Sequence, residues 1–272
     1  MNQTLFTSVS TLSQLQKKLD IISNNMANID TNGYKRREAS FSELLNQNTA
    51  NMLQENREIG RLTPNGIRVG AGARIAQTQM VGTQGSLQTT GRDLDLAFTK
   101  ENQLFKVLVQ EDGESSVHYT RSGAFAVTPL GEDEVMLVTS EGHSVLDQDN
   151  QPITFNPNEG EIALAESGVL RAGGQTFNLG VVEVMRPQLL QSAGSNLFSL
   201  PDEMPVPQNE IVRELTAKAR DEIGLQHGSL EKSNVDLTKE MTDMLTVQRA
   251  YQLQSRSISL ADQMMGLING VR

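Results

Sequence analysis

The feature that most constrains this chain is a heptad pattern close to its N-terminus. Apolar residues recur there every three or four positions, at Leu12, Leu15, Leu19, Ile22, Met26 and Ile29. This spacing gives a helix one narrow apolar stripe, which needs a partner helix to cover it. We expect the helix to run over residues 1 to about 30 and to stop between Asn28 and Arg36. Asx and Gly residues in that stretch compete with helical backbone bonds.

A second long helix is predicted from Asp236 to about Asn269. Its heptad-like seam consists of Met241, Met244, Tyr251, Ile258, Ala261, Met265 and Ile268. Further apolar residues, among them Leu253 and Leu260, widen its apolar surface beyond a two-helix stripe. A helix that is apolar on more than one face needs more than one partner. We expect the N-terminal helix to be one partner and neighbouring subunits to supply the others.

The sequence pattern in the middle of the chain predicts β structure. Short apolar runs alternate with turn residues from Ile67 to about residue 200, which is typical of a sandwich or irregular barrel. Gly173-Gly174 predicts a two-residue hairpin because such turns need positive φ angles. Ser40 to Glu43 has the spacing of a capping box and predicts a short helix.

The expected fold is therefore an α+β multidomain protein, with its long terminal helices paired as a coiled coil and a mostly-β domain inserted between them. Residues 1–34 and 229–272 would form the terminal helical domain, which is the axial core. Residues 35–66 and 201–228 would be connectors, and residues 67–200 the β domain.

Composition excludes several classes of function. Asp plus Glu number 33 against 23 Lys plus Arg, a net charge of −10, so nucleic acid and anionic membranes are poor partners. The absence of cysteine rules out disulfides and cysteine-based metal sites. No apolar run approaches transmembrane length, so we expect no membrane insertion. The N-terminus lacks the charge and apolar pattern of a cleavable signal peptide.

No stretch has the pattern of a catalytic, cofactor or metal site, and we expect no enzyme activity. The histidines are far apart and lack metal-ligand spacing: His118, His143 and His227. Asp147 to Gln151 resembles the start of a calcium loop, but Pro152 stands where the loop needs glycine, which favours a turn. Asp93 and Asp95 would share the solvated face of a strand, with no base or nucleophile nearby.

The predicted stop of the first helix lies in a recognisable motif. Residues 23–36, with Asn24, Asn25, Asn28, Thr31, Gly33 and Tyr34, resemble the N-terminal signature of bacterial flagellar rod and hook proteins. Residues 233–236, 240–244, 248–251 and 261–264 are similar to the family's C-terminal signature. Residues 66–72 and 84–95 are similar to motifs of the distal-rod branch. Residues 100–105 depart from the family pattern, which leaves room for a divergent paralogue.

The resemblance implies a structural subunit of the basal-body rod that assembles helically into a torque-transmitting tube with an export channel. Its partners would be further copies of itself, other rod and hook proteins, and the type III export apparatus. It would leave the cell without a cleaved signal peptide and reside in the basal body. Phe41 and Leu45 occupy the family positions implicated in engaging the export gate.

Other interpretations stay open at this point. The chain could be a proximal rod subunit or a hook-type axial subunit, although hook proteins usually carry a larger β insertion. From other classes, it could be a wall-polymer hydrolase with helical oligomerisation arms, or a helical-stalk adhesin.

Overall fold

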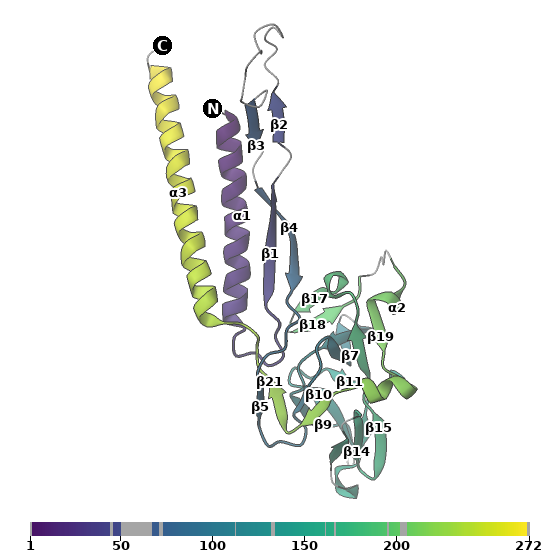
Figure 1. Cartoon of the computed structure of the whole chain (residues 1–272). Helices are drawn as coiled ribbons and strands as arrows, with labels where there is room; N and C mark the ends of the chain where they lie inside the picture. The colour runs from purple at the N-terminus through teal and green to yellow at the C-terminus, as the bar shows by residue number, and fades with distance from the viewer. Residues whose placement is uncertain are drawn as a thin grey trace. The chain divides into compact units, whose positions relative to one another are not determined.

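Two long helices form the ends of the described chain. In the computed structural model, α1 spans Asn2–Ala27 and α3 spans Leu237–Gly270 (Figure 1). At about 1.5 Å per residue they are roughly 39 Å and 51 Å long. α1 ends directly before the Asx-rich turn, and α3 begins one residue after Asp236. The α+β class with two long terminal helices is therefore confirmed.

Between these helices the chain is mostly β. The structure describes residues 2–43, 46–49, 67–70, 73–111, 113–131, 134–160, 162–165, 167–194, 196–201 and 206–270. The strands are β1 (Arg37–Glu43), β2 (Asn46–Thr49), β3 (Ile67–Gly70), β4 (Ala73–Met80), β5 (Leu87–Thr89), β6 (Leu96–Phe98), β7 (Gln103–Glu111), β8 (Glu114–Thr120), β9 (Phe125–Pro129), β10 (Val135–Thr139), β11 (Ser144–Val145), β12 (Thr154–Phe155), β13 (Ala163–Ala165), β14 (Val169–Ala172), β15 (Gln175–Asn178), β16 (Val181–Val184), β17 (Gln191–Gly194), β18 (Leu197–Ser199), β19 (Val212–Glu214), β20 (Leu225–His227) and β21 (Ser229–Glu231). Short helices are η2 (Pro157–Glu159), η3 (Pro187–Leu189), α2 (Gln208–Ile211) and η4 (Ala217–Glu222).

The chain divides into two compact units. We call Met1–Met26, Arg37–Thr78 and Leu237–Arg272 the helical unit. We call Ala27–Arg36 and Gln79–Asp236 the β unit. In the helical unit, β1 pairs with β4 and β2 pairs with β3. The segment that follows α1 belongs to the β unit, so the N-terminal signature is shared between both units.

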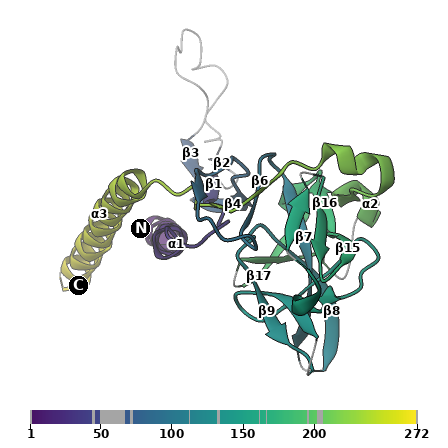
Figure 2. The same cartoon turned by 90° about the horizontal axis from the view of Figure 1, so that it is seen from below.

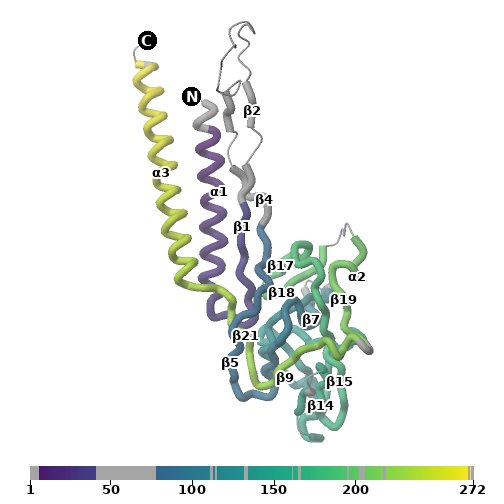
Figure 3. The backbone as a smooth tube through the Cα atoms, in the orientation of Figure 1, coloured from purple at the N-terminus to yellow at the C-terminus, as the bar shows by residue number. Residues whose placement is uncertain are grey.

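A ten-stranded sheet organises the β unit. Its main order is β12-β10-β11-β7-β8-β18-β17, with β9 beside β10 and with β16 joining β7 to β19. β7 lies between β8 and β16 (Figure 2). The segment 201–228, expected as a connector, contributes α2, β19, η4 and β20 to this unit in its described part. β20 pairs with β6, and β21 pairs with β5 before the chain enters α3 (Figure 3).

The predicted hairpin at Gly173-Gly174 is confirmed. β14 and β15 pair antiparallel with Ala172 opposite Gln175, so two residues make the turn. Both glycines have positive φ, at 57° and 68°. This is the backbone that a primed two-residue turn requires and that other residues adopt at a cost.

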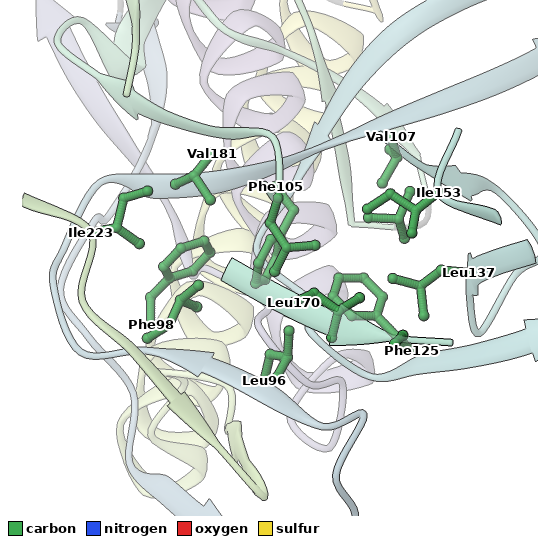
Figure 4. Packing of buried hydrophobic residues seen from close by; sticks show 14 of the residues in the cluster. Leu96, Phe98, Phe105, Val107, Phe125, Leu137, Ile153, Leu170, Val181 and Ile223 are labelled. Atoms are coloured by element: carbon green, nitrogen blue, oxygen red, sulfur yellow. The ribbon is translucent and has the colours of Figure 1, made fainter. Parts of the chain in front are cut away.

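The core of the β unit contains three of the chain's eight phenylalanines in contact. The ring of Phe105 lies 4.3 Å from that of Phe98 and 5.0 Å from that of Phe125, measured between centroids (Figure 4). The Phe105–Phe125 pair is edge-to-face, a favoured arrangement of aromatic quadrupoles. Aliphatic side chains complete the cluster, among them Leu96, Leu137, Ile153 and Leu170. The sheet is thus held by one aromatic centre surrounded by branched aliphatics.

The short helix predicted at Ser40–Glu43 is wrong, because these residues belong to β1. A capping-box spacing is a local signal worth little by itself. Pairing with β4 in a two-stranded sheet overrides it. The expectation for Leu45 lies outside the described residues.

The placement of Asp93 and Asp95 on one solvated strand face is also wrong. Asp93 is exposed in a turn, whereas Asp95 is only 1% exposed, and its backbone bonds to Arg92 and Ser229. Asp93 lies in a turn that precedes β6, so the two carboxylates do not belong to one strand and do not share a face.

A glycine in the core of the β unit gives a direct test of this packing. A Cβ on Gly123 would lie 1.8 Å from the carbonyl oxygen of Leu96, so Gly123→Ala must displace backbone. We expect it to lower the free energy of unfolding by about 1–3 kcal/mol or more, measured by denaturant titration. Gly131→Ala is the matched control, because a Cβ there meets nothing within 4 Å. Equal stability of the two variants would contradict the described packing.

Candidate functional site

Asn25 ties the end of α1 to two other segments of the helical unit. Its side chain is 1% exposed, and its amide nitrogen donates to the carbonyl of Arg37 at 2.9 Å and to Oε2 of Glu240 at 3.2 Å. Its amide oxygen accepts the N–H of Arg37 at 3.0 Å. Glu240 lies in the first turn of α3 and is 3% exposed. One buried amide of the N-terminal signature therefore contacts the C-terminal signature.

A tight turn follows the helix. The Thr31 hydroxyl donates to Oδ1 of Asn28 at 3.2 Å, as expected where Asx residues replace helical bonds. The backbone N–H of Tyr34 donates to the Thr31 carbonyl at 3.3 Å. The carbonyl of Asn32 accepts the side-chain amide of Asn196 at 3.0 Å. The turn is thereby held both internally and by the loop between β17 and β18.

Gly33 is required by its position in this turn. Its φ is +72°, and its N–H donates to the Glu231 carbonyl at 2.7 Å. A Cβ would lie 2.7 Å from the backbone of both Arg121 and Ser122. Left-handed backbone and this close approach each favour glycine. This explains why a glycine stands directly before the Tyr34-Lys35 pair.

Beyond Gly33, a buried ionic cluster connects three distant parts of the β unit. Lys35 Nζ lies 2.5 Å from Oε1 of Glu231, and Arg121 Nε lies 2.6 Å from its Oε2. Lys35, Arg121 and Glu231 are 5%, 2% and 3% exposed. Lys35 also donates to the Thr83 carbonyl at 2.9 Å, and the N–H of Gly85 donates to Oε1 of Glu231 at 2.9 Å.

Arg121 uses its remaining donors on a neighbouring loop. It donates to the carbonyls of Gln103 at 2.6 Å and Lys100 at 2.9 Å. Its guanidinium carbon lies 4.9 Å from the centroid of the Phe98 ring, a cation–π distance. A planar fork with five donors suits this task better than lysine would. Arg121 therefore links the ionic cluster to the phenylalanine core.

The side chain of Asn234 joins the segment after the N-terminal turn to the segment around Val81. Its Oδ1 accepts the N–H of Arg36 at 2.7 Å, while its amide donates to the carbonyls of Val81 and Thr83, each at 2.9 Å. The N–H of Val81 donates to the Arg36 carbonyl at 2.8 Å. The chain entering the β unit and the chain leaving it are thus bound to one shared segment. We call Gly33, Lys35, Arg121, Glu231 and Asn234 the terminal junction.

Electrostatics favour an ionised Glu231. Burial acts to raise the pKa of this carboxyl, but the charges of Arg121 and Lys35 and the hydrogen bonds from Lys35 and Gly85 outweigh it, so the pKa is lowered. Burial lowers the pKa of Lys35 and of Arg121, and the carboxylate of Glu231 partly offsets this in both. Removing the charge of Glu231 would leave the two buried cations with only the weaker electrostatic support of Glu101.

The terminal junction is arranged to hold backbone segments together. Both oxygens of Glu231 already accept hydrogen bonds from protein donors. Among the described residues, no group of three or more His, Cys, Asp or Glu side chains is placed to hold a metal ion. In that same part of the chain, no helix is long and apolar enough to cross a membrane. The turn predicted at Asp147 is present, and its Oδ1 accepts the N–H groups of Asp149 and Gln151.

Only some residues of the two predicted seams are buried or half-buried. In the N-terminal seam Ile22 is buried, and the other five members are half-buried: Leu12, Leu15, Leu19, Met26 and Ile29. Of the C-terminal seam, four members are half-buried: Met244, Ile258, Ala261 and Met265. The other three are exposed by 47%, 37% and 55%: Met241, Tyr251 and Ile268.

Sequence reasoning missed several residues that contribute here. Val247, three positions after Met244, is 4% exposed, and its heptad spacing was a usable signal. Glu240 also falls on that spacing, although a carboxylate gives no apolar signal. Arg121 and Glu231 are 110 positions apart, so no local pattern could have paired them.

A second face of α3 is exposed in the part of the chain that the structure describes. Four large apolar side chains with spacings of seven, four and three residues are between 52% and 72% exposed: Leu253, Leu260, Met264 and Leu267. Helical geometry places them together and apart from the half-buried stripe. We call these four residues the exposed leucine face. Of the export-gate candidates, Phe41 lies in β1 and Leu45 falls outside the described residues.

Comparison with known proteins agrees with this arrangement at both ends. The family model described as flagella basal body rod protein matches residues 5–35. The model described as flagellar basal body rod FlgEFG protein C-terminal matches residues 226–271. The two matched ranges contain the contacts Asn25–Glu240 and Lys35–Glu231, which join the ends of the chain.

Sequence similarity to relatives extends over the whole chain, including the β unit. The flagellar hook-basal body complex protein FlhP of Bacillus subtilis is 42% identical over 100% of both chains. The flagellar basal-body rod protein FlgG of Borreliella burgdorferi is 33% identical, over 100% of this chain and 99% of its own. FlgG of Bacillus subtilis is 29% identical over 97% of both.

Two long terminal helices, with matched signatures at both ends of the chain, define a structural protein of the bacterial flagellum. The chain belongs to the flagellar basal-body rod protein family, and it is a structural subunit of the basal-body rod.

Removing the negative charge of the terminal junction should destabilise the β unit strongly. Glu231→Gln leaves Lys35 and Arg121 buried without their paired carboxylate, which typically costs about 3–5 kcal/mol in the free energy of unfolding. The matched control is Glu183→Gln, whose partner Arg213 is exposed, so stability should change little. Denaturant titration of both variants gives the comparison. Equal effects would show that the cluster does not stabilise the fold.

The same variant should alter the dependence of stability on pH. Because the folded-state pKa of Glu231 is lowered, its contribution is present above the unfolded pKa of about 4.3 and is lost as pH falls through the folded value. The stability difference between wild type and Glu231→Gln should therefore shrink as the pH falls below about 4. A difference that stays constant over that range would contradict the assignment.

Proposed function

We propose that the chain is a distal-rod subunit whose terminal helices pack with those of neighbouring copies into a helical tube. The observation that supports this most is the exposed leucine face of α3. Large apolar side chains at helical spacing are costly to leave in water and mark a surface for another helix. A heterologous contact of this kind repeats from copy to copy without closing, which builds a filament.

Burial of this face would contribute favourably to assembly. Burying a leucine or methionine side chain contributes roughly 1.5–3 kcal/mol when it goes from fully exposed to fully buried. The four residues are already partly covered, so about half of that each is a fair figure, or several kcal/mol per subunit. Association entropy opposes this gain, but every subunit makes the contact again along the tube.

In this proposal the seam residues of α1 and α3 form the coiled-coil core around the export channel. Residues 1–34 and 229–272 would make the axial domain and residues 35–66 would lead away from it, while the described part of 201–228 belongs with the β domain outside. The terminal junction fits a torque-bearing role, because rotation applied to one part of the subunit must pass through the segments that it binds together.

The partners proposed are further copies, other rod and hook proteins, and the type III export apparatus, with export to the basal body and no cleaved signal. A proximal-rod or hook-type position remains the alternative within the family. The distal position rests on the similarity of residues 66–72 and 84–95 to the distal-rod motifs.

We infer that the chain is not an enzyme. A wall-polymer hydrolase needs two carboxylates facing a shared cleft. Asp93 is exposed while Asp95 is buried, and Glu231 is saturated by protein donors. A helical-stalk adhesin would need none of the flagellar signatures at both ends. Turnover of peptidoglycan by the purified chain would favour the hydrolase.

Assembly can be tested without disturbing the folded subunit. Leu260 is 60% exposed, so Leu260→Asp should leave the melting temperature of the monomer unchanged. In the rod it would put a carboxylate into an apolar contact, at a cost of several kcal/mol per subunit, and motility and rod formation should be lost. Ser259→Asp introduces the same charge at the adjacent exposed position and should assemble. Normal swimming of the Leu260→Asp strain would remove the main support for the proposal.

The export role can be tested separately. If Phe41 and Leu45 engage the export gate, Phe41→Ala should retain the protein in the cytoplasm, because an apolar anchor is lost. Secreted and cellular fractions are compared by immunoblot. Ser42→Ala, a small change in the same strand β1, is the control and should be exported normally. Normal export of the Phe41→Ala variant would restrict Phe41 to local structure.

A further inference from the structure

The exposed side of α3 carries charge as well as apolar side chains. Arg249 and Arg256 fall within the same arc of about 80° around the helix as the exposed leucine face. Both are exposed, and in the described part of the chain neither side chain makes a hydrogen bond or an ion pair. The acidic residues of α3 lie outside this arc: Glu240, Asp243 and Asp262. The face is therefore apolar and positively charged.

α1 has an exposed face of its own, on the side opposite Ile22. Four exposed residues within an arc of about 60° form it, and we call them the α1 outer face: Phe6, Val9, Ser13 and Asp20. The first two are 76% and 56% exposed. Asp20 is the acidic residue of α1, and its carboxylate has no hydrogen-bond or ion-pair partner among the described residues. Lys17 lies at the edge of this face.

The two faces match when the helices lie antiparallel. The spacing from Val9 to Asp20 equals the spacing from Arg249 to Leu260. Placing Asp20 opposite Arg249 therefore puts Val9 opposite Leu260. One register thus forms a charge pair at one end and an apolar contact at the other.

The remaining positions fit the same register. Phe6 falls beside Met264, which adds a second apolar contact. Ser13 falls opposite Arg256, where a small side chain leaves room for a large one. Lys17 falls beside Leu253, and its alkyl chain can cover the leucine while the ammonium group stays in water.

These two faces belong to different copies. Within one chain the side chains that join α1 to α3 are the buried Asn25 and Glu240, which lie away from both exposed faces. Two copies of the α3 face do not complement each other, because each carries two arginines and no carboxylate. α1 and α3 run in opposite directions, so copies stacked with one polarity present them antiparallel (Figure 1).

We propose that the exposed leucine face of one copy packs antiparallel on the α1 outer face of a neighbouring copy, with Arg249 paired to Asp20. The inference rests on the proposed assembly through the terminal helices, and it names the surface that receives the exposed leucine face. Two different faces of one chain make a heterologous contact, which repeats from copy to copy. The apolar residues supply the attraction, and the charges fix the register.

The register is tested with cysteines, which the chain lacks. Val9→Cys and Leu260→Cys chains are co-expressed in cells without the wild-type chain, and isolated basal bodies are mildly oxidised. Because a disulfide needs Cβ atoms within about 4.5 Å, dimers should appear on a non-reducing gel only when both variants are present. Leu253→Cys, on the same face but roughly 10 Å along α3, replaces Leu260→Cys in the control and should give none.

Three outcomes of the crosslinking experiment would overturn the proposal. Dimers formed by Leu260→Cys alone would show that two α3 faces meet. A disulfide-free rod would show that the two positions are apart. Dimers of equal yield with Leu253→Cys would show that the helices have no fixed register.

Charge reversal separates this contact from the proposed function. Asp20→Arg and Arg249→Asp each place like charges opposite one another at every subunit, so each should abolish swimming. The chain with both substitutions restores opposite charges and should swim, a rescue that misfolding would not give. If Leu260→Asp prevents rod formation while both single reversals swim normally, assembly through α3 stands and the pairing with α1 is wrong. Failure of the double variant to swim would likewise contradict the pairing.

Discussion

The ion pairs of the buried Glu231 carboxylate are the interactions on which the terminal junction of the β unit depends. The carboxylate accepts from Lys35, which follows the N-terminal signature, and from Arg121, which belongs to the sheet. Glu231 itself lies in β21, the last strand before α3. A buried ion pair adds little net stability compared with apolar residues in the same place. Replacing only one of its partners, however, is strongly destabilising. Its use here is therefore to specify which segments meet.

The two ends of the chain combine opposite physical properties. At the terminal junction the polar groups are buried and hydrogen-bonded, so the segments there have little freedom. Along α3 the reverse holds, because large apolar side chains such as Leu253 and Leu267 lie in solvent. A subunit with an exposed apolar helix surface is suited to a structure completed by its neighbours. This division is consistent with the family's role as a structural component of the rod.

The hydrophobic core of the β unit supports the terminal junction. Its sheet is centred on Phe98, Phe105 and Phe125, and Arg121 lies against the first of these rings. The junction is thus supported by the core, and the turn carrying Asn32 is supported by the junction.

The sequence by itself determined the elements with strong local periodicity or turn residues: both long helices, the end of the first near the Asx-rich turn, and the Gly173-Gly174 hairpin. Their signals come from residues close together in the chain. The sequence-based prediction was wrong at Ser40–Glu43, where the capping pattern predicts a helix but the segment forms β1 and pairs with β4. Only the tertiary structure decided the terminal junction, because Lys35, Arg121 and Glu231 are far apart in sequence and charge carries no periodicity. It also decided that Val247 is covered while Tyr251 is exposed, since the coverage of each position depends on what lies beside the helix.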